Sequence, residues 1–221
     1  MDSLLATGLY AVASWLLAHA LRTNTHTRHS NSKLLEQFTV CWWSNRERAI
    51  ENTTSPNKYF DHTILKADAT VQALDAVIDE AKRFRFQSVC VNSCHASYVK
   101  EKLRGYDDIR VCCVVGFPLG AMDTTSKVNE ARKCIHDGAS EIDMVMNVGY
   151  FKSGDNYREL FVNDLKEVID VCHQHNIICK VILETCLLSL QEVRGASILA
   201  LEAGAGTYTY HYTLLSHHST N

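Results

Sequence analysis

The stretch CIHDGASEIDMVMN, residues 134–147, joins a helix-like segment to a short apolar run through a single glycine. Glycine often ends a helix because it adopts the left-handed backbone conformation without steric cost. The run EIDMVMN, residues 141–147, is nearly continuous in apolar residues, which is typical of a strand buried on both faces. The stretch therefore predicts a helix that ends at Gly138 and leads directly into a buried strand.

A second joint of this kind lies further along the chain. ALEAGAGTYTYH, residues 200–211, has the same order of helix end, Gly-Ala and strand start. Aligning Gly138 with Gly204 places Asp143 opposite Thr209. Joints that repeat in this way favour a barrel of alternating strands and helices.

Between residues 59 and 205 the whole chain alternates in this manner. Short runs rich in β-branched residues predict strands at 59–65, 88–92, 110–117, 141–147 and 178–185. Helical periods predict helices at 69–84, 123–138, 155–176 and 189–204, the last with a capping box formed by Ser189 and Glu192. The alternation indicates an α/β fold with a parallel sheet, either an open doubly wound sheet or a closed (β/α) barrel. No glycine-rich loop follows the first strand, which disfavours the dinucleotide-binding version of the open sheet.

The composition is that of an ordinary globular protein. The 221 residues are 46% apolar and 21% charged, with a net charge of -3, so we expect no nucleic-acid or membrane partner. The nine cysteines show one short spacing, Cys90 to Cys94, and no second pair that would complete a zinc site. We therefore expect buried thiols in a reducing compartment and no metal.

The first 55 residues are expected to form a separate N-terminal extension that ends near Pro56. Its apolar start, residues 4–21, is barely long enough to span a bilayer and contains small and polar residues. A secretory signal needs positive charge before the apolar core, and only Asp2 precedes it. The basic stretch that follows resembles an organellar transit segment; a surface amphipathic helix and a doubtful gene start remain alternatives.

Two charged residues lie inside predicted strands. Asp143 lies between Ile142 and Met144, and Lys180 lies between Cys179 and Val181. A buried charge is costly unless it is paired or used in chemistry, so these two side chains are candidates for a shared acid–base site. The alternatives are an Asp143 satisfied by backbone amides and a Lys180 that marks the solvated start of its strand.

Five motifs in series resemble the deoxyribose-phosphate aldolase family. They are DHTILKADAT (61–70), SVCVN (88–92), VVGFPLG (114–120), EIDMVMNVG (141–149) and KVILETCLL (180–188). The resemblance implies a class I aldolase on an eight-stranded TIM-type barrel, in which a lysine Schiff base cleaves 2-deoxyribose 5-phosphate into glyceraldehyde 3-phosphate and acetaldehyde. It also implies that no cofactor is needed and that the protein is cytoplasmic and serves deoxyribonucleotide catabolism, with the organellar location as the alternative.

The resemblance also assigns roles to individual residues. Asp143 corresponds to the family's proton-relay aspartate, and Asp61, Cys90, Glu184 and Thr185 match positions near the substrate. The family's Schiff-base lysine lies in D-F-[IV]-K-T-S-T-G after a helix that ends A-G-A. Here Thr209 holds that position, and a hydroxyl group cannot form an iminium. The printed chain has no lysine after Lys180.

These departures predict an incomplete barrel. We expect an aldolase-like part at 56–205, with about five to six of the eight strands, and a divergent tail at 206–221 produced by a change of frame or splicing. Open sheet edges in such a barrel favour association, including homo-oligomers. The chain is then either an inactive fragment or isoform that acts only with other chains, or a distinct lyase or isomerase that uses Asp143 and Lys180.

Overall fold

The computed structural model describes residues 56–205 and 207–209 of the chain. The chain divides into two units, and everything below concerns the second, residues 57–221. The expectations for residues 1–55, and for the tail apart from one short strand, lie outside the described residues. Among the helices that are described, none is long and apolar enough to cross a membrane.

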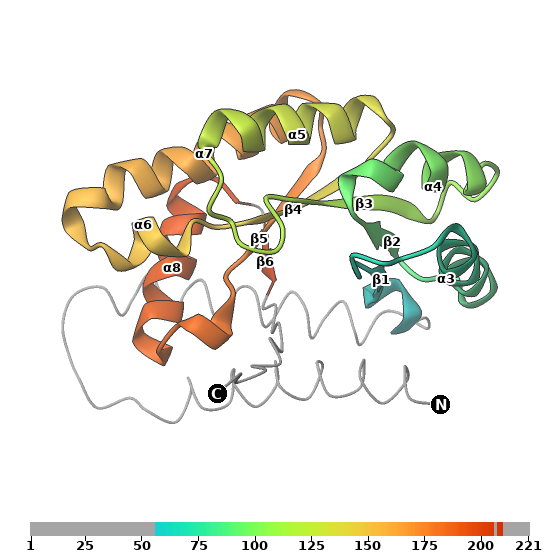
Figure 1. The fold of residues 1–221 in the computed structure, drawn as a ribbon, viewed down its shortest axis with the longest axis horizontal. Coiled ribbons are helices and arrows are strands. Elements are labelled where there is room, and N and C mark those ends of the chain that lie inside the picture. Colours follow the sequence, from blue (N-terminus) through green and yellow to red (C-terminus); the bar gives the residue numbers. More distant parts are fainter. Residues whose placement is uncertain (1–55, 206, 210–221) are drawn as a thin grey trace. The chain divides into compact units, whose positions relative to one another are not determined.

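Six parallel strands form one sheet in which each strand lies beside its neighbours in the chain (Figure 1). They are β1 (Asp61–Ile64), β2 (Ser88–Val91), β3 (Arg110–Val115), β4 (Glu141–Val145), β5 (Ile178–Ile182) and β6 (Thr207–Thr209). An open doubly wound sheet would reverse its strand order at a switch point, so the sequential order confirms the barrel-type fold. Within the described residues the sheet is not closed, because β1 pairs only with β2 and β6 only with β5.

Helices follow the strands and cover one face of the curved sheet (Figure 1). The main ones are α3 (Val71–Phe84), α4 (Ala96–Lys102), α5 (Thr124–His136), α6 (Val148–Lys152), α7 (Arg158–Gln174) and α8 (Leu190–Glu202). Four short 3-10 turns complete them: η1 (Pro56–Tyr59), η2 (Ser93–His95), η3 (Asp155–Tyr157) and η4 (Thr185–Leu187). The four long predicted helices are confirmed, whereas α4 and α6 were not predicted.

All five predicted strands are shorter in the structure than in the sequence analysis, and β3, β4 and β5 end two or three residues before the predicted runs do. Gly116, at φ +67°, ends β3, and Asn147 caps the start of α6 by accepting a hydrogen bond from the Tyr150 amide. Glu184 has a left-handed backbone, φ 52°, just beyond β5. The apolar runs continue past these points because the connecting segments are themselves buried, so hydrophobicity alone could not locate the strand ends.

The two glycine joints share one geometry. Gly138 has φ +103° and Gly204 has φ +96°, and each ends a helix. The amide after each glycine donates to the carbonyl five residues before it, Ala139 to Cys134 and Ala205 to Ala200. The strands β4 and β6 then begin at the same distance beyond each glycine. The repeat predicted from the sequence is therefore present, and residues 143 and 209 occupy equivalent places in β4 and β6.

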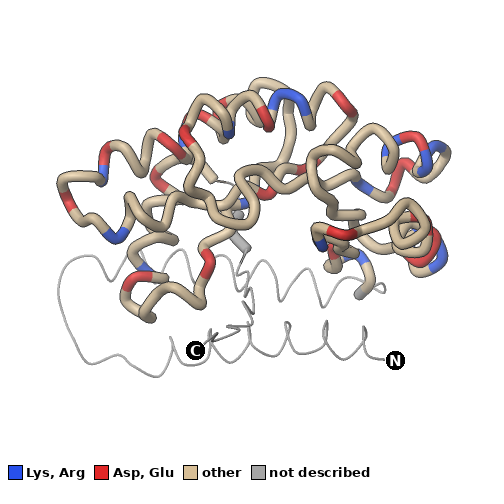
Figure 2. The backbone as a smooth tube through the Cα atoms, viewed as in Figure 1, with Lys and Arg blue, Asp and Glu red and all other residues tan. Residues whose placement is uncertain are grey.

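Alternate residues of each strand face two different environments. Ile142 and Met144 of β4 pack in the main core beneath the helices. Val145 belongs to a smaller cluster on the inner face, with Cys90, Cys112, Val114 and Ile182. Asp143 and Lys180 lie two residues before Val145 and Ile182 in their strands, so their side chains point to the same inner face. Figure 2 shows that most other acidic and basic residues lie on the helices and connecting segments.

Candidate active site

Lys180 is the centre of a charged cluster on the inner face of the sheet. Its Nζ donates a hydrogen bond of 2.7 Å to Asp61 Oδ2 and lies 3.1 Å from Asp143 Oδ1. Glu141 Oε2 is farther away, at 3.9 Å from the same nitrogen. The residue is only 7% exposed, so the alternative that Lys180 marks a solvated strand start is wrong.

Asp143 lies at the same depth as Lys180, because the register of β4 and β5 pairs the two residues directly. The side chain is buried, and its Oδ1 accepts no well-aligned hydrogen bond among the described residues. Burial raises the pKa of Asp143 to about 6; the nearby Asp61 also raises it, while Lys180 acts in the opposite direction. A carboxyl group of this kind can accept and return a proton near neutral pH.

Lys180 is held in its protonated form. Burial acts to lower the pKa of Lys180, but the neighbouring acidic groups, first Cys112 and then Asp143, Asp61 and Glu141, more than reverse this, and the net pKa is raised. A lysine must be neutral to attack a carbonyl. The ion pairs therefore favour the charged form of Lys180 over the neutral form that a nucleophile needs.

Further polar residues fix the carboxylates. Ser88 Oγ donates to Asp61 Oδ1 at 2.6 Å, and Arg110 Nη1 donates to Glu141 Oε1 at 2.7 Å. Glu141 is 4% exposed, and its other oxygen, Oε2, has no aligned partner among the described residues. Three carboxylates thus face two cations, and the cluster as a whole favours binding a further positive charge or a proton.

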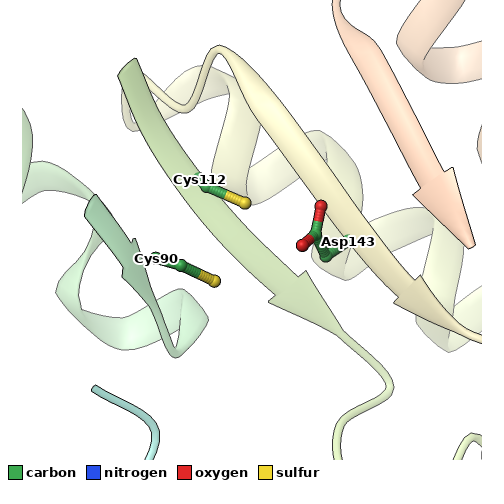
Figure 3. Close-up of side chains that lie close together, drawn as sticks. All are labelled: Cys90, Cys112 and Asp143. Carbon is green, nitrogen blue, oxygen red and sulfur yellow. The ribbon is translucent and has the colours of Figure 1, made fainter. Parts of the chain in front are cut away.

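Cys90 belongs to the same inner face. It is paired in register with Cys112 on β3, and both are buried. The two sulfur atoms and a carboxylate oxygen of Asp143 lie within 4.8 Å of one another. Figure 3 shows the three side chains projecting from β2, β3 and β4 into one space. A hydrogen bond with Cys90 and burial raise the pKa of the Cys112 thiol well above its usual range, so this thiol is neutral at pH 7.

The other predicted site residues lie elsewhere. Glu184 and Thr185 follow the carboxyl end of β5, where Glu184 is buried and Thr185 begins η4. Position 209 lies in β6 beside Ile182, next to the strand that carries Lys180. The structure thus brings Asp61, Cys90, Asp143 and Lys180 together, and the roles assigned to all of these residues remain predictions.

The sequence analysis missed four residues that the structure adds to this face: Ser88, Arg110, Cys112 and Glu141. Each lies two residues from an inner-face strand residue, and side chains two apart in a strand point to the same face. That period of two was the available signal. It was hidden because the strands are apolar on both faces, so their sequences do not alternate.

Comparison with known proteins agrees with this fold. Residues 57–216 match the model of the DeoC/LacD family aldolases. A deoxyribose-phosphate aldolase from Mycoplasma mobile is 48% identical over 149 residues, which are 67% of this chain and 66% of that protein. One from Finegoldia magna is 49% identical over 150 residues, 67% of this chain and 68% of its own length.

A solved structure described as "QR15, an Aldolase" shares 32% identity with a TM-score of 0.64, covering 71% of this chain and 67% of that one. The chain therefore spans about two thirds of the length of the relatives it matches. The family model covers well over half of the 221 residues. This chain belongs to the DeoC/LacD aldolase family.

Proposed function

We propose that the chain carries the proton-transfer part of a deoxyribose-phosphate aldolase site but not its covalent centre. The substrate class is a sugar phosphate, 2-deoxyribose 5-phosphate, which the family's reaction splits into glyceraldehyde 3-phosphate and acetaldehyde. Support comes from the relatives named deoxyribose-phosphate aldolase and from the Asp61–Lys180–Asp143 cluster. The cleaved bond lies between two carbons, so the reaction is that of a lyase.

Asp143 has the properties that the proton-transfer role needs. In an imine mechanism the iminium accepts the electron pair of the breaking carbon–carbon bond, while a proton leaves the departing hydroxyl and another returns to carbon. A carboxyl group with a pKa of about 6 can do both near neutral pH. Lys180 and Asp61 position it: Lys180 contacts both carboxylates, and Ser88 holds Asp61 in place.

The covalent step is where this chain differs from the family pattern. Position 209, where the resemblance expects the imine-forming lysine, is threonine. The observation that carries the proposal is the ion pairing of Lys180, since this lysine could replace the missing one only if it were neutral. Contacts of 2.7 and 3.1 Å to two carboxylates keep it charged. We therefore expect the chain alone not to cleave the sugar phosphate.

Borohydride trapping tests this directly. The full chain is incubated with 2-deoxyribose 5-phosphate and sodium borohydride, and the adduct is located by mass spectrometry. We expect no adduct on the natural chain and an adduct on residue 209 in Thr209→Lys. The double variant Thr209→Lys/Asp143→Asn is the matched control, since it should form the adduct but release little acetaldehyde. A reduced adduct on Lys180 in the natural chain would instead support a lyase that uses Asp143 and Lys180.

A second candidate function is association with other chains. The described sheet leaves β1 and β6 each with a single partner strand, and unpaired strand edges are templates for pairing. In this case the chain acts as a subunit and not as a catalyst. Homo-oligomers and complexes with a related chain that carries the lysine both fit this function.

A further inference from the structure

The space between β2, β3 and β4 collects three side chains of the kind that bind metals. We propose that Cys90, Cys112 and Asp143 form a binding site for a thiophilic divalent cation, with Zn²⁺ as the natural example. The proposal goes beyond the aldolase reaction, which uses none of these groups as metal ligands. It rests on the placement of the three ligand atoms, which come from three adjacent strands and point into one space (Figure 3).

The distances suit a single ion. Two sulfur atoms and one carboxylate oxygen lie within 4.8 Å of one another. Zinc binds cysteine sulfur at about 2.3 Å and carboxylate oxygen at about 2.0–2.2 Å, so ligands of one tetrahedral ion lie roughly 3.5 Å apart. To bind one ion, each ligand atom would have to move by about 1 Å or less. Rotation about side-chain bonds can supply such a movement. The backbone of the strands does not have to move.

The ligand types select the ion. Two sulfur ligands disfavour Mg²⁺ and Ca²⁺, which bind oxygen, and favour Zn²⁺ and its heavier analogue Cd²⁺. Binding replaces the two thiol protons, so each ion that enters releases two protons to solvent. Two thiolates and the Asp143 carboxylate contribute three negative charges, and the ion contributes two positive charges. Lys180, 3.1 Å from Asp143 and 2.7 Å from Asp61, adds a further positive charge beside the ligands.

The surrounding structure fixes the three ligand side chains in place, as a metal site requires. Cys112 is fully buried and Cys90 is 3% exposed, and both lie within strands paired on each side, so their positions are fixed. Lys180 holds one oxygen of Asp143 and is itself held by Asp61. Three protein ligands leave a fourth position open, as in sites where a metal meets water or a substrate.

Other cysteine pairs in the structure serve as a comparison. Cys113 lies within hydrogen-bond reach of Cys134, and Cys172 of Cys179. Neither pair has a third ligand-type side chain close by; in the described part of the chain, only Cys90, Cys112 and Asp143 form such a group. These two pairs therefore provide matched controls of the same chemistry and similar burial.

The site has a consequence for the proposed function. Asp143 would serve both as metal ligand and as proton carrier, and Cys90 lies at the predicted substrate position. An ion bound here and the aldolase proton transfer are therefore mutually exclusive. Metal binding itself is measured without sugar phosphate, so a failure of the aldolase proposal leaves this one testable.

Titration with Cd²⁺ in a metal-free reducing buffer tests the site. The full chain is used with Cys41, Cys94 and Cys186 changed to serine, because Cys94 and Cys186 are exposed and Cys41 lies outside the described residues. We expect one equivalent of Cd²⁺ to produce a thiolate charge-transfer band. Adding Cys112→Ser should weaken binding more than about tenfold, the scale seen when a residue that merely orients a ligand is lost. Adding Cys134→Ser should leave it unchanged.

A second variant and a second measurement guard against misfolding. Asp143→Ala keeps both thiols and should also weaken Cd²⁺ binding more than about tenfold, with circular dichroism reporting that the fold is retained. X-ray absorption of the zinc-loaded protein should show two sulfur ligands together with oxygen ligands. The proposal is overturned if no ion binds, if Cys112→Ser binds as well as Cys134→Ser, or if the ligand shell is entirely sulfur.

Discussion

Asp143 is an acid whose surroundings oppose its ionisation, and this gives the protein a specific pH dependence. The pKa is 3.8 in the unfolded chain and about 6 in the folded protein, where burial is the largest cause. Between these values the folded protein holds a proton that the unfolded chain has released. The contribution of Asp143 to the free energy of unfolding is therefore fully present below about pH 4 and is lost as the pH rises through about 6.

The difference corresponds to about 3 kcal/mol in the free energy of unfolding. We expect Asp143→Asn, which cannot ionise, to lose this pH dependence. The free energy of unfolding of the natural chain should therefore decrease relative to that of the variant between about pH 4 and pH 7. Urea denaturation of both proteins, with a chelator present, measures the difference. Equal pH slopes for the two proteins would show that Asp143 titrates normally and is not poised for proton transfer.

At the scale of single elements, α8 shows how local sequence signals define a helix. Ser189 Oγ accepts a hydrogen bond from the Glu192 amide, and the Glu192 carboxylate accepts one from the Ser189 amide. Loss of such a cap costs about 1 kcal/mol. We expect Ser189→Ala to lower the free energy of unfolding by about this amount. Ser197→Ala is the control, because that hydroxyl bonds to the Val193 carbonyl inside the same helix and caps nothing.

The contact between α5 and α7 depends on a buried ion pair. Lys127 and Asp164 are both 0% exposed; Lys127 Nζ lies 2.6 Å from Asp164 Oδ2 and 3.0 Å from the Val145 carbonyl. Burial lowers the pKa of Lys127, and Asp164 counteracts this. Removing one partner leaves a buried charge unpaired, which costs roughly 3–5 kcal/mol. We expect Asp164→Asn to show a loss of this size in urea denaturation.

The control for this pair is Lys166→Met, which breaks the exposed pair with Asp170 on the same helix. Surface pairs contribute about 0–1 kcal/mol, so its effect should be small. The double change Lys127→Met/Asp164→Leu should cost less than the two single changes added together, because it leaves no charge behind. An Asp164→Asn protein as stable as Lys166→Met would mean that water reaches the pair.

The elements that the sequence predicted are those with strong local signals. The helices α3, α5, α7 and α8 are long enough to show an apolar period, and Gly138 and Gly204 mark two of their ends. The helices α4 and α6 span only seven and five residues, too few for a period to be visible. Their positions follow from how the chain leaves β2 and β4, which is a tertiary property.

Some residues of the candidate site could also be predicted from local sequence signals, and others could not. Asp143 and Lys180 were predicted because a charge inside an apolar strand is conspicuous in a sequence. Glu141 and Cys112 were not, since their importance depends on which residues of neighbouring strands lie opposite them. The register places Cys112 opposite both Cys90 and Glu141, and no local pattern determines a register between strands far apart in sequence.

For the whole molecule, the important feature is a curved parallel sheet with two edge strands. Parallel sheets normally have both faces covered, and a closed barrel has no edge strands. In the described residues β1 has one neighbour and β6 has one neighbour, so each presents unpaired backbone groups at one side. Pairing of these edges with another chain would satisfy such groups.

We expect the full chain to associate as its concentration rises, and a charge on an edge strand to oppose this. Thr63 lies in β1 with its side chain exposed, so Thr63→Lys adds a charge at the edge with little cost to folding. Sedimentation velocity over a range of concentrations should show an increase in average mass for the natural chain and a weaker increase for Thr63→Lys. Thr125→Lys, the same change at an exposed position of helix α5, should behave like the natural chain. A natural chain that stays monomeric throughout would contradict association through the sheet edge and leave the second candidate function without support.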